Sequence, residues 1–240
     1  MSKFTWFTGR GPALTHSQLE RLRALREPAE LDERSLRQQR FVVLDLETSG
    51  LNMRRDQVLS IGAVVIDNGA IDLSQQFECT LQRDGHQASA STLIHGIAPS
   101  QIANGVEPAE ALLDFMEFVG DSPLLAFHAE FDQRMLARAL KQSLGYRLRH
   151  AFFDVAEIAP LVCPQAKPGL AGLAGLAGLD DWTEYFGLQV QERHHASADA
   201  LATAELALIL LSKARQQQLD NLPALLQALN SRRRQRAYSM

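Results

Sequence analysis

The chain has 240 residues, a net charge of −4 and a pI near 6.0. This length suits one domain of roughly 170–200 residues with extensions at its ends. Hydrophobic residues make up 46% and charged residues 22%, as in ordinary globular proteins. The slightly acidic balance does not indicate a nucleic-acid binder, which is often basic. It is compatible with an enzyme that holds cations between carboxylates.

Targeting and membrane segments are not indicated by the sequence. The N-terminal stretch MSKFTWFTGRGP lacks the apolar core of a signal peptide. The apolar stretch LATAELALILL is interrupted by Glu205 and is too short to span a bilayer. Cys79 and Cys163 stand far apart, so neither a disulfide framework nor a zinc site follows. We expect a cytoplasmic protein with no membrane partner.

The first half is predicted to contain a helical extension and three strands. Within residues 1–37, leucines recur at helical spacing between His16 and Arg26, and Pro28 follows as a stop. Apolar, β-branched runs then predict strands at 41–47, 58–67 and 70–81. The Asp-Asn-Gly turn at 67–69 predicts a hairpin, so three antiparallel strands are expected in succession.

The second half is predicted to alternate between strands and helices. Strands are expected at 124–127 and 151–154, and helices at 108–119, 130–140, 181–186 and 196–213, with a further helix that ends near Pro164. This order predicts a mixed α/β sheet flanked by helices, in a domain that spans residues 38–215. Residues 216–240 are expected to form a C-terminal helix and a basic tail.

Two segments have a biased composition. The Leu-Ala-Gly repeat in PGLAGLAGLAGLDD, at 168–181, resembles a phosphate loop only superficially, because no Lys-Ser/Thr follows it. We interpret it as a flexible linker. The end of the chain, SRRRQRAYSM, is interpreted as a solvated, disordered terminus. The alternative is a weak electrostatic handle for phosphate backbones.

Asp45 and Glu47, in FVVLDLETSGL, are the first residues that indicate chemistry. On a strand, residues i and i+2 point to the same face, so the two carboxylates share one face while Leu44 and Leu46 point into a core. Adjacent carboxylates repel each other, and a bound divalent cation removes that repulsion. A solvent-facing acidic strand end has the same pattern, so the pair alone is weak evidence.

Two later segments carry further candidates. In HAEFDQRML, Asp132 is expected in the first turn of a helix. There it is either a site residue or simply a carboxylate that caps the helix. In HHASADALATAEL, His194 is expected in the loop before a helix and Asp199 within its first turns. The two then converge on one site, unless they are a capping histidine and an ordinary helical aspartate. Four carboxylates can hold two divalent cations for phosphoryl transfer, and a nearby histidine can take a proton from the attacking water.

Taken in this order, the three segments resemble the motifs of the DnaQ-like 3′→5′ exonucleases of the DEDD superfamily. The resemblance is to the branch whose general base is histidine, which includes the proofreading epsilon subunit of bacterial DNA polymerase III. The intervening IHGIAPSQI, at 94–102, resembles the family segment that closes over the terminal nucleotide. The resemblance covers roughly residues 38–213 and implies a ribonuclease H-like sheet flanked by helices.

The resemblance also implies roles for individual residues. The metal carboxylates fall on Asp45, Glu47, Asp132 and Asp199, with two Mg²⁺ or Mn²⁺ ions as cofactors and His194 as the general base. The substrate contacts fall on Thr48, Leu51, His95, Ile97 and His128. The chain departs from the family at His128, where asparagine is common, and in the Leu-Ala-Gly repeat, where the family has a shorter approach. Asp154 matches a family aspartate to which we assign a structural role.

The implied substrate is the 3′ end of a DNA strand, in single-stranded form. Two alternatives remain open at this stage. The first is an exonuclease of the same fold that prefers RNA, because a 2′-hydroxyl preference depends on details of the pocket. The second is a non-catalytic module that binds nucleic acid or docks in a replication assembly. A polymerase or repair partner is expected to be a separate chain.

Overall fold

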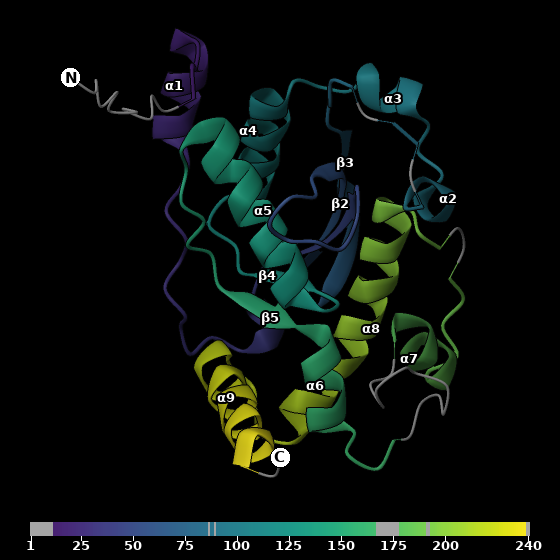
Figure 1. Cartoon of the computed structure of the whole chain (residues 1–240). Helices are drawn as coiled ribbons and strands as arrows, with labels where there is room; N and C mark the ends of the chain where they lie inside the picture. The colour runs from purple at the N-terminus through teal and green to yellow at the C-terminus, as the bar shows by residue number, and fades with distance from the viewer. Residues whose placement is uncertain (1–11, 86, 89, 167–177, 191–192, 239–240) are drawn as a thin grey trace, which may run out of the picture.

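A five-stranded sheet forms the middle layer of the structure (Figure 1). The structure is a computed structural model that describes residues 12–85, 87–88, 90–166, 178–190 and 193–238. The strand order is β3-β2-β1-β4-β5. The antiparallel strands are β1 (Phe41–Thr48), β2 (Val58–Asp67) and β3 (Ala70–Thr80), and β4 (Leu124–Ala126) and β5 (Phe152–Asp154) continue the sheet in parallel with β1. The predicted mixed α/β sheet and its hairpin are confirmed.

Helices cover both faces of the sheet (Figure 1). One face packs against α4 (Pro108–Val119) and α5 (Ala129–Leu144), and the other against α6 (Val155–Val162), α8 (Ala196–Gln216) and α9 (Leu222–Tyr238). The remaining helices are short: α1 (His16–Ala24), η1 (Leu36–Gln38), α2 (Thr92–His95), α3 (Pro99–Ala103) and α7 (Leu179–Tyr185). No helix in the described part of the chain is long and apolar enough to cross a membrane.

The central strand β1 serves both helical layers. Phe41 and Val43 pack on the side of α8, whereas Val42 and Leu44 pack on the side of α4 and α5. A strand buried on both faces is apolar at nearly every position. Asp45 and Glu47 continue the alternation of Phe41 and Val43, so their side chains leave the strand on the α8 side.

The two ends of the chain are both packed onto the domain. The predicted N-terminal helix is confirmed as α1, and Arg21 joins it to α4 through Glu110, Asp114 and Glu117. The expected disordered terminus is wrong for residues 231–238, which form the last part of α9. Buried leucines at 222, 225 and 229 anchor this helix, and Arg233 pairs with Glu157 of α6.

Two other expectations about organisation remain untested. The Leu-Ala-Gly repeat falls largely at 167–177, outside the described residues. The division of the chain at residues 37/38 and 215/216 stays a prediction.

The start of α8 lies directly on β2. Asp45, Gly62 and Glu78 stand abreast on β1, β2 and β3. A Cβ atom at Gly62 would overlap backbone atoms of Ala196 and Ser197, so only glycine leaves room for the first turn of α8. Ser197 Oγ donates a hydrogen bond of 2.8 Å to a carboxylate oxygen of Glu78. The row of three residues therefore fixes where α8 begins.

Replacing Gly62 with alanine tests this close approach. The added methyl group must push the start of α8 off the sheet, and overpacking of this kind costs typically 1–3 kcal/mol. We expect the Tm of Gly62→Ala to fall by several degrees in thermal unfolding. Gly178→Ala is the matched control, because its Cβ would meet only a carboxylate oxygen of Asp181, at 3.7 Å. Equal Tm values for the two variants would contradict the packing.

Candidate active site

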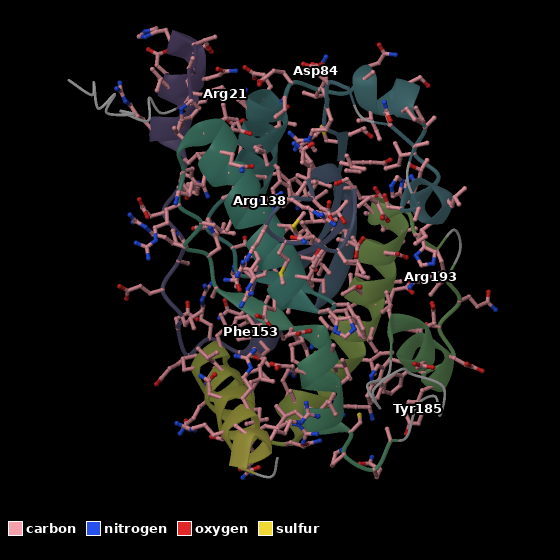
Figure 2. All side chains as sticks on the ribbon, viewed as in Figure 1. Arg21, Asp84, Arg138, Phe153, Tyr185 and Arg193 are labelled. Carbon is pink, nitrogen blue, oxygen red and sulfur yellow. The ribbon has the colours of Figure 1, made fainter. Side chains whose placement is uncertain are left out.

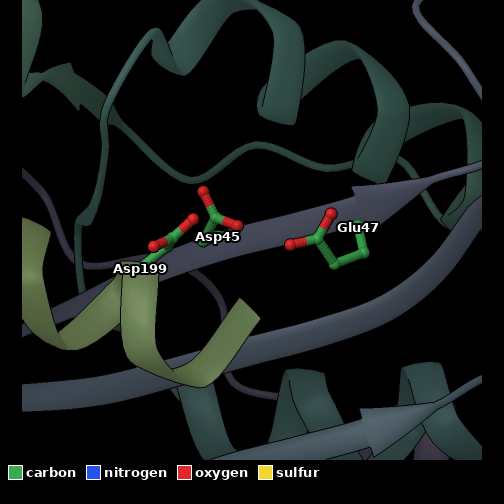
Figure 3. Close-up of side chains that lie close together, drawn as sticks. All are labelled: Asp45, Glu47 and Asp199. Atoms are coloured by element: carbon green, nitrogen blue, oxygen red, sulfur yellow. The ribbon is translucent and has the colours of Figure 1, made fainter. Parts of the chain in front are cut away.

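Three carboxylates meet where α8 crosses β1 (Figure 3). Asp45 and Glu47 come from β1, and Asp199 comes from the first turn of α8. One oxygen from each lies within 4.8 Å of the others. Asp45 and Glu47 are partly buried and Asp199 is buried. The structure thus brings together residues that stand more than 150 positions apart in the sequence.

Asp132 lies next to this group without belonging to it. It occupies the first turn of α5, as the sequence predicts, and is 4% exposed. Its negative charge raises the pKa of Asp45, and the pKa of Asp132 itself is raised well above its usual value by burial and by the charge of Asp154. Asp132 therefore adds to the negative charge that the three carboxylates share.

The cluster is held at a cost in electrostatic free energy. Burial raises the pKa of Asp45 well above its usual range, and the charges of Asp132, Glu47 and Asp199 add to the shift. Burial and the charge of Asp199 raise the pKa of Glu47 to about 7. Buried carboxylates that face one another gain stability from a cation between them.

The ligand atoms at the seam, where α8 crosses β1, suit a hard divalent cation. Only carboxylate oxygens make up the group of mutually close ligand atoms found among the described residues. Mg²⁺ and Mn²⁺ prefer oxygen ligands. Burial first and the neighbouring carboxylates second raise the pKa values of Asp45 and Glu47, and a bound cation would favour their ionised forms. The residues present therefore fit a divalent metal site.

His194 reaches the cluster through its backbone. It lies in the loop before α8, as predicted, with a φ of 65°, and its backbone N–H donates a hydrogen bond of 3.1 Å to Asp199 Oδ2. Its side chain is exposed and does not belong to the group of close ligand atoms. The neighbouring His195 instead pairs with Glu78, at 3.3 Å.

The predicted substrate contacts lie in different surroundings. The Thr48 hydroxyl donates a hydrogen bond of 2.9 Å to the carbonyl of Gly50, and Leu51 is 84% exposed. The ring of His95, at the end of α2, accepts a hydrogen bond of 3.1 Å at Nδ1 from the backbone N–H of Ile97. The segment predicted to close over the nucleotide runs from the end of α2 into α3, and this contact lies in the turn between the two helices.

His128 begins α5 and borders a hollow of about 270 Å³. The other lining residues are Met53, Glu130, Phe131 and Asp154. Asp154 accepts hydrogen bonds from the backbone N–H groups of His128, at 3.0 Å, and Ala156, at 2.9 Å. The structural role predicted for Asp154 is confirmed, since it ties the start of α5 to the start of α6.

Sequence reasoning missed three residues at the site. Arg193 pairs with Asp199, Gly62 makes room for α8, and Glu78 holds Ser197 and His195. A glycine inside an otherwise β-branched strand is a recognised sign of close backbone approach, so Gly62 had a readable signal. Arg193 and Glu78 had none, because their partners lie on other elements.

Glu47 gives the metal-free protein a stability that depends on pH. Its folded pKa of about 7 exceeds its ordinary value of 4.5. Between these values the folded state keeps a proton that the unfolded chain loses. The free energy of unfolding therefore falls as the pH rises from about 4.5 to about 7.

The matched variant for this prediction is Glu47→Gln, whose amide does not ionise. We expect the Tm measured in a chelator to fall by a few degrees more in the wild type than in the variant between about pH 5 and pH 7.5. Mg²⁺ should restore the wild-type Tm, because it stabilises the ionised carboxylate. Identical pH dependence in the two proteins would contradict the raised pKa.

Comparison with known proteins gives the chain its family. A model of the RNase T exonuclease family matches residues 42–207. The PolC-type DNA polymerase III of Caldanaerobacter subterraneus subsp. tengcongensis is 31% identical over 173 residues, which are 72% of this chain and 12% of that protein. The PolC-type enzyme of Bacillus subtilis is 27% identical over 184 residues, again 12% of its length. The chain thus spans about an eighth of these relatives.

Solved structures share the fold. Escherichia coli exonuclease I in complex with a dT13 oligonucleotide superposes with a TM-score of 0.62 at 17% identity, over 75% of this chain and 42% of that one. Cell-death related nuclease 4 superposes with a TM-score of 0.63 at 14% identity, over 72% and 64%. The expected ribonuclease H-like fold is confirmed. Because the family match covers more than half of the sequence, the chain belongs to the RNase T family of DnaQ-like exonucleases.

Proposed function

We propose that this exonuclease removes nucleotides one at a time from the 3′ end of single-stranded DNA and releases 5′-mononucleotides. The observation that carries the proposal is the meeting of Asp45, Glu47 and Asp199, with one oxygen of each within 4.8 Å of the others. Asp132, buried beside them, completes a set of four carboxylates. Four such groups are enough to hold two divalent cations in a phosphodiesterase site.

The cofactors proposed for this site are two Mg²⁺ or Mn²⁺ ions. When bound, they supply positive charge beside the attacking water and beside the leaving 3′ oxygen. Asp45, Glu47, Asp132 and Asp199 would hold them. Since Asp45 and Glu47 come from one strand and Asp199 from α8, the contact between α8 and β2 at Gly62 sets the geometry of the site.

His194 is proposed as the general base, which assigns the enzyme to the histidine branch of the family. Its backbone N–H donates to Asp199, and the residue is exposed. The imidazole nitrogen would take a proton from water as the new oxygen–phosphorus bond forms. The bond between phosphorus and the 3′ oxygen then breaks. The leaving 3′ oxygen takes a proton from water, so the shortened strand ends in a 3′-hydroxyl, and the phosphate departs on the released nucleotide.

The remaining proposed contacts hold the terminal nucleotide. Thr48, Leu51, His95, Ile97 and His128 are assigned to this role by family resemblance. Leu51 is 84% exposed and offers an apolar surface for a base to stack on. Such contacts read shape and stacking more than sequence, so we expect modest sequence preference.

DNA is favoured over RNA by what related proteins contain. Relatives at about 30% identity are PolC-type DNA polymerases, and structures of E. coli exonuclease I hold dT13 and dA16 oligonucleotides. A polymerase or repair protein as a separate partner chain, and a cytoplasmic location, stay predictions.

The direct test is degradation of a 5′-labelled single-stranded DNA oligonucleotide in Mg²⁺. We expect a ladder that shortens from the 3′ end, abolished by a chelator and by Asp45→Ala, because each removes the metal ions. An RNA of equal sequence should be degraded more slowly. Faster degradation of RNA would move the substrate to RNA, and full activity in Asp45→Ala would overturn the metal centre.

His194→Gln tests the general base. Loss of a general base typically lowers kcat by 10²- to 10⁴-fold. We expect a loss of that order in kcat with the Tm nearly unchanged. His195→Gln is the control, since His195 contacts Glu78 instead of the cluster. Equal loss in both variants would contradict the assignment.

A further inference from the structure

Arg193 joins the carboxylate cluster to α7. Arg193 is labelled in Figure 2, on the side of the molecule where α8 lies. Its Nη1 donates to Asp199 Oδ1, and its Nε donates to Asp180 Oδ1 in the first turn of α7. The Arg193 side chain is 25% exposed, whereas Asp199 is 8% and Asp180 is 69% exposed. One end of the bridge is therefore buried at the cluster, and the other faces solvent.

Both oxygens of Asp199 are already engaged in this structure. Oδ1 accepts from Arg193, and Oδ2 accepts from the backbone N–H of His194 at 3.1 Å. A divalent cation that binds Asp199 through Oδ1 therefore competes with the Arg193 guanidinium for that oxygen. The competition is electrostatic, because two positive groups cannot approach the same oxygen without repelling each other.

Arg193 also supplies the positive charge that the cluster feels. Its charge lowers the pKa of both Asp45 and Glu47, against the larger effect of burial. Among the residues placed in the structure, it is the cationic side chain in contact with this group of three carboxylates. Once divalent cations provide that charge, the ion pair between Arg193 and Asp199 contributes much less electrostatic stabilisation.

Asp180 gives the guanidinium a second anchor outside the cluster. A displaced Arg193 side chain keeps its contact with Asp180, near the solvent-exposed edge of the site. Arg193 is partly exposed beside the buried Asp199, so its guanidinium is within reach of a phosphate that approaches the carboxylates from the side of Asp180. A guanidinium binds phosphate with two parallel hydrogen bonds, a geometry that lysine does not offer.

We propose that Arg193 is a phosphate-positioning residue that is paired with Asp199 until metal ions bind. Divalent cations displace its guanidinium from Asp199. The guanidinium then binds the phosphate of the 3′-terminal nucleotide and keeps its ion pair with Asp180. This inference rests on the proposed function of the site. It gives the loop before α8 a role in substrate binding in addition to that of His194.

The proposal predicts two changes of opposite sign in Arg193→Gln. Mn²⁺ alone, titrated into the full chain by calorimetry, should bind several-fold more tightly, because its competitor is gone. The mononucleotide dTMP, titrated at saturating Mn²⁺, should bind on the order of tenfold more weakly, because hydrogen bonds to a charged phosphate are lost. Thymidine, which has no phosphate, should show no such change. Arg193→Lys should recover dTMP binding only in part, since it lacks the planar fork.

Arg215→Gln is the matched control. Arg215 lies near the other end of α8 and pairs with Asp220 at 3.2 Å, so this variant also loses one cation from an ion pair. Arg215 follows Asp199 by sixteen residues along α8, a distance of roughly 24 Å at about 1.5 Å per residue. This distance exceeds the Debye length at physiological salt. Its affinities for Mn²⁺ and dTMP should match those of the wild type.

The opposite signs separate this role from a structural one. If Arg193 only stabilises its loop, Arg193→Gln weakens the binding of both Mn²⁺ and dTMP, and that result overturns the proposal. Unchanged affinity for either probe overturns it as well. Failure of the wild type and of Arg215→Gln to bind Mn²⁺ would instead refute the metal centre itself, as would binding by Asp45→Asn equal to that of the wild type.

Discussion

Electrostatic repulsion acts among three carboxylates at the seam between β1 and α8, those of Asp45, Glu47 and Asp199. The structure around them has to compensate for this repulsion. Burial strengthens it, which the raised pKa values of Asp45 and Glu47 record. The backbone N–H of His194 and the guanidinium of Arg193 offset part of it at Asp199. The same charge that destabilises the metal-free fold attracts the cations that the chemistry needs, so stability and function are opposed at this point.

The fold brings these charges together by means of very small side chains. Gly62 stands beside Asp45 in the sheet and lets backbone atoms of α8 approach β2. Glu78, next in the same row, then holds the start of α8 through Ser197. Alanines along α8 are buried against the sheet and keep the helix close for several turns. Close packing at this seam places Asp199, and the proposed mechanism depends on that placement.

Most of the architecture could be predicted because it follows from local patterns. The alternation along residues 41–47 correctly put Asp45 and Glu47 on one face, and the polar start of α5 correctly located Asp132. Residues 231–238 could not be predicted as helical from their charge alone. Their helix is held by leucines that precede them and by the contact between Arg233 and Glu157 of another helix.

Contacts between distant elements were equally hidden from sequence patterns. Nothing in the sequence spacing of Arg193, Asp180 and Asp199 shows that Arg193 bridges the two aspartates. The pattern did predict His194 in the loop before α8, but its left-handed backbone and its hydrogen bond to Asp199 emerge only when that helix sits on the sheet. Family resemblance supplied the residue roles in advance, and the structure supplied the charges and contacts that constrain them.

The central claim is that divalent cations neutralise the carboxylates at the seam of β1 and α8. Anomalous scattering from crystals grown with Mn²⁺ measures this directly. We expect anomalous density in contact with oxygens of Asp45, Glu47 and Asp199, with the Arg193 guanidinium no longer on Asp199. Crystals that show no density at these oxygens at saturating Mn²⁺, with Arg193 still paired to Asp199, would contradict it.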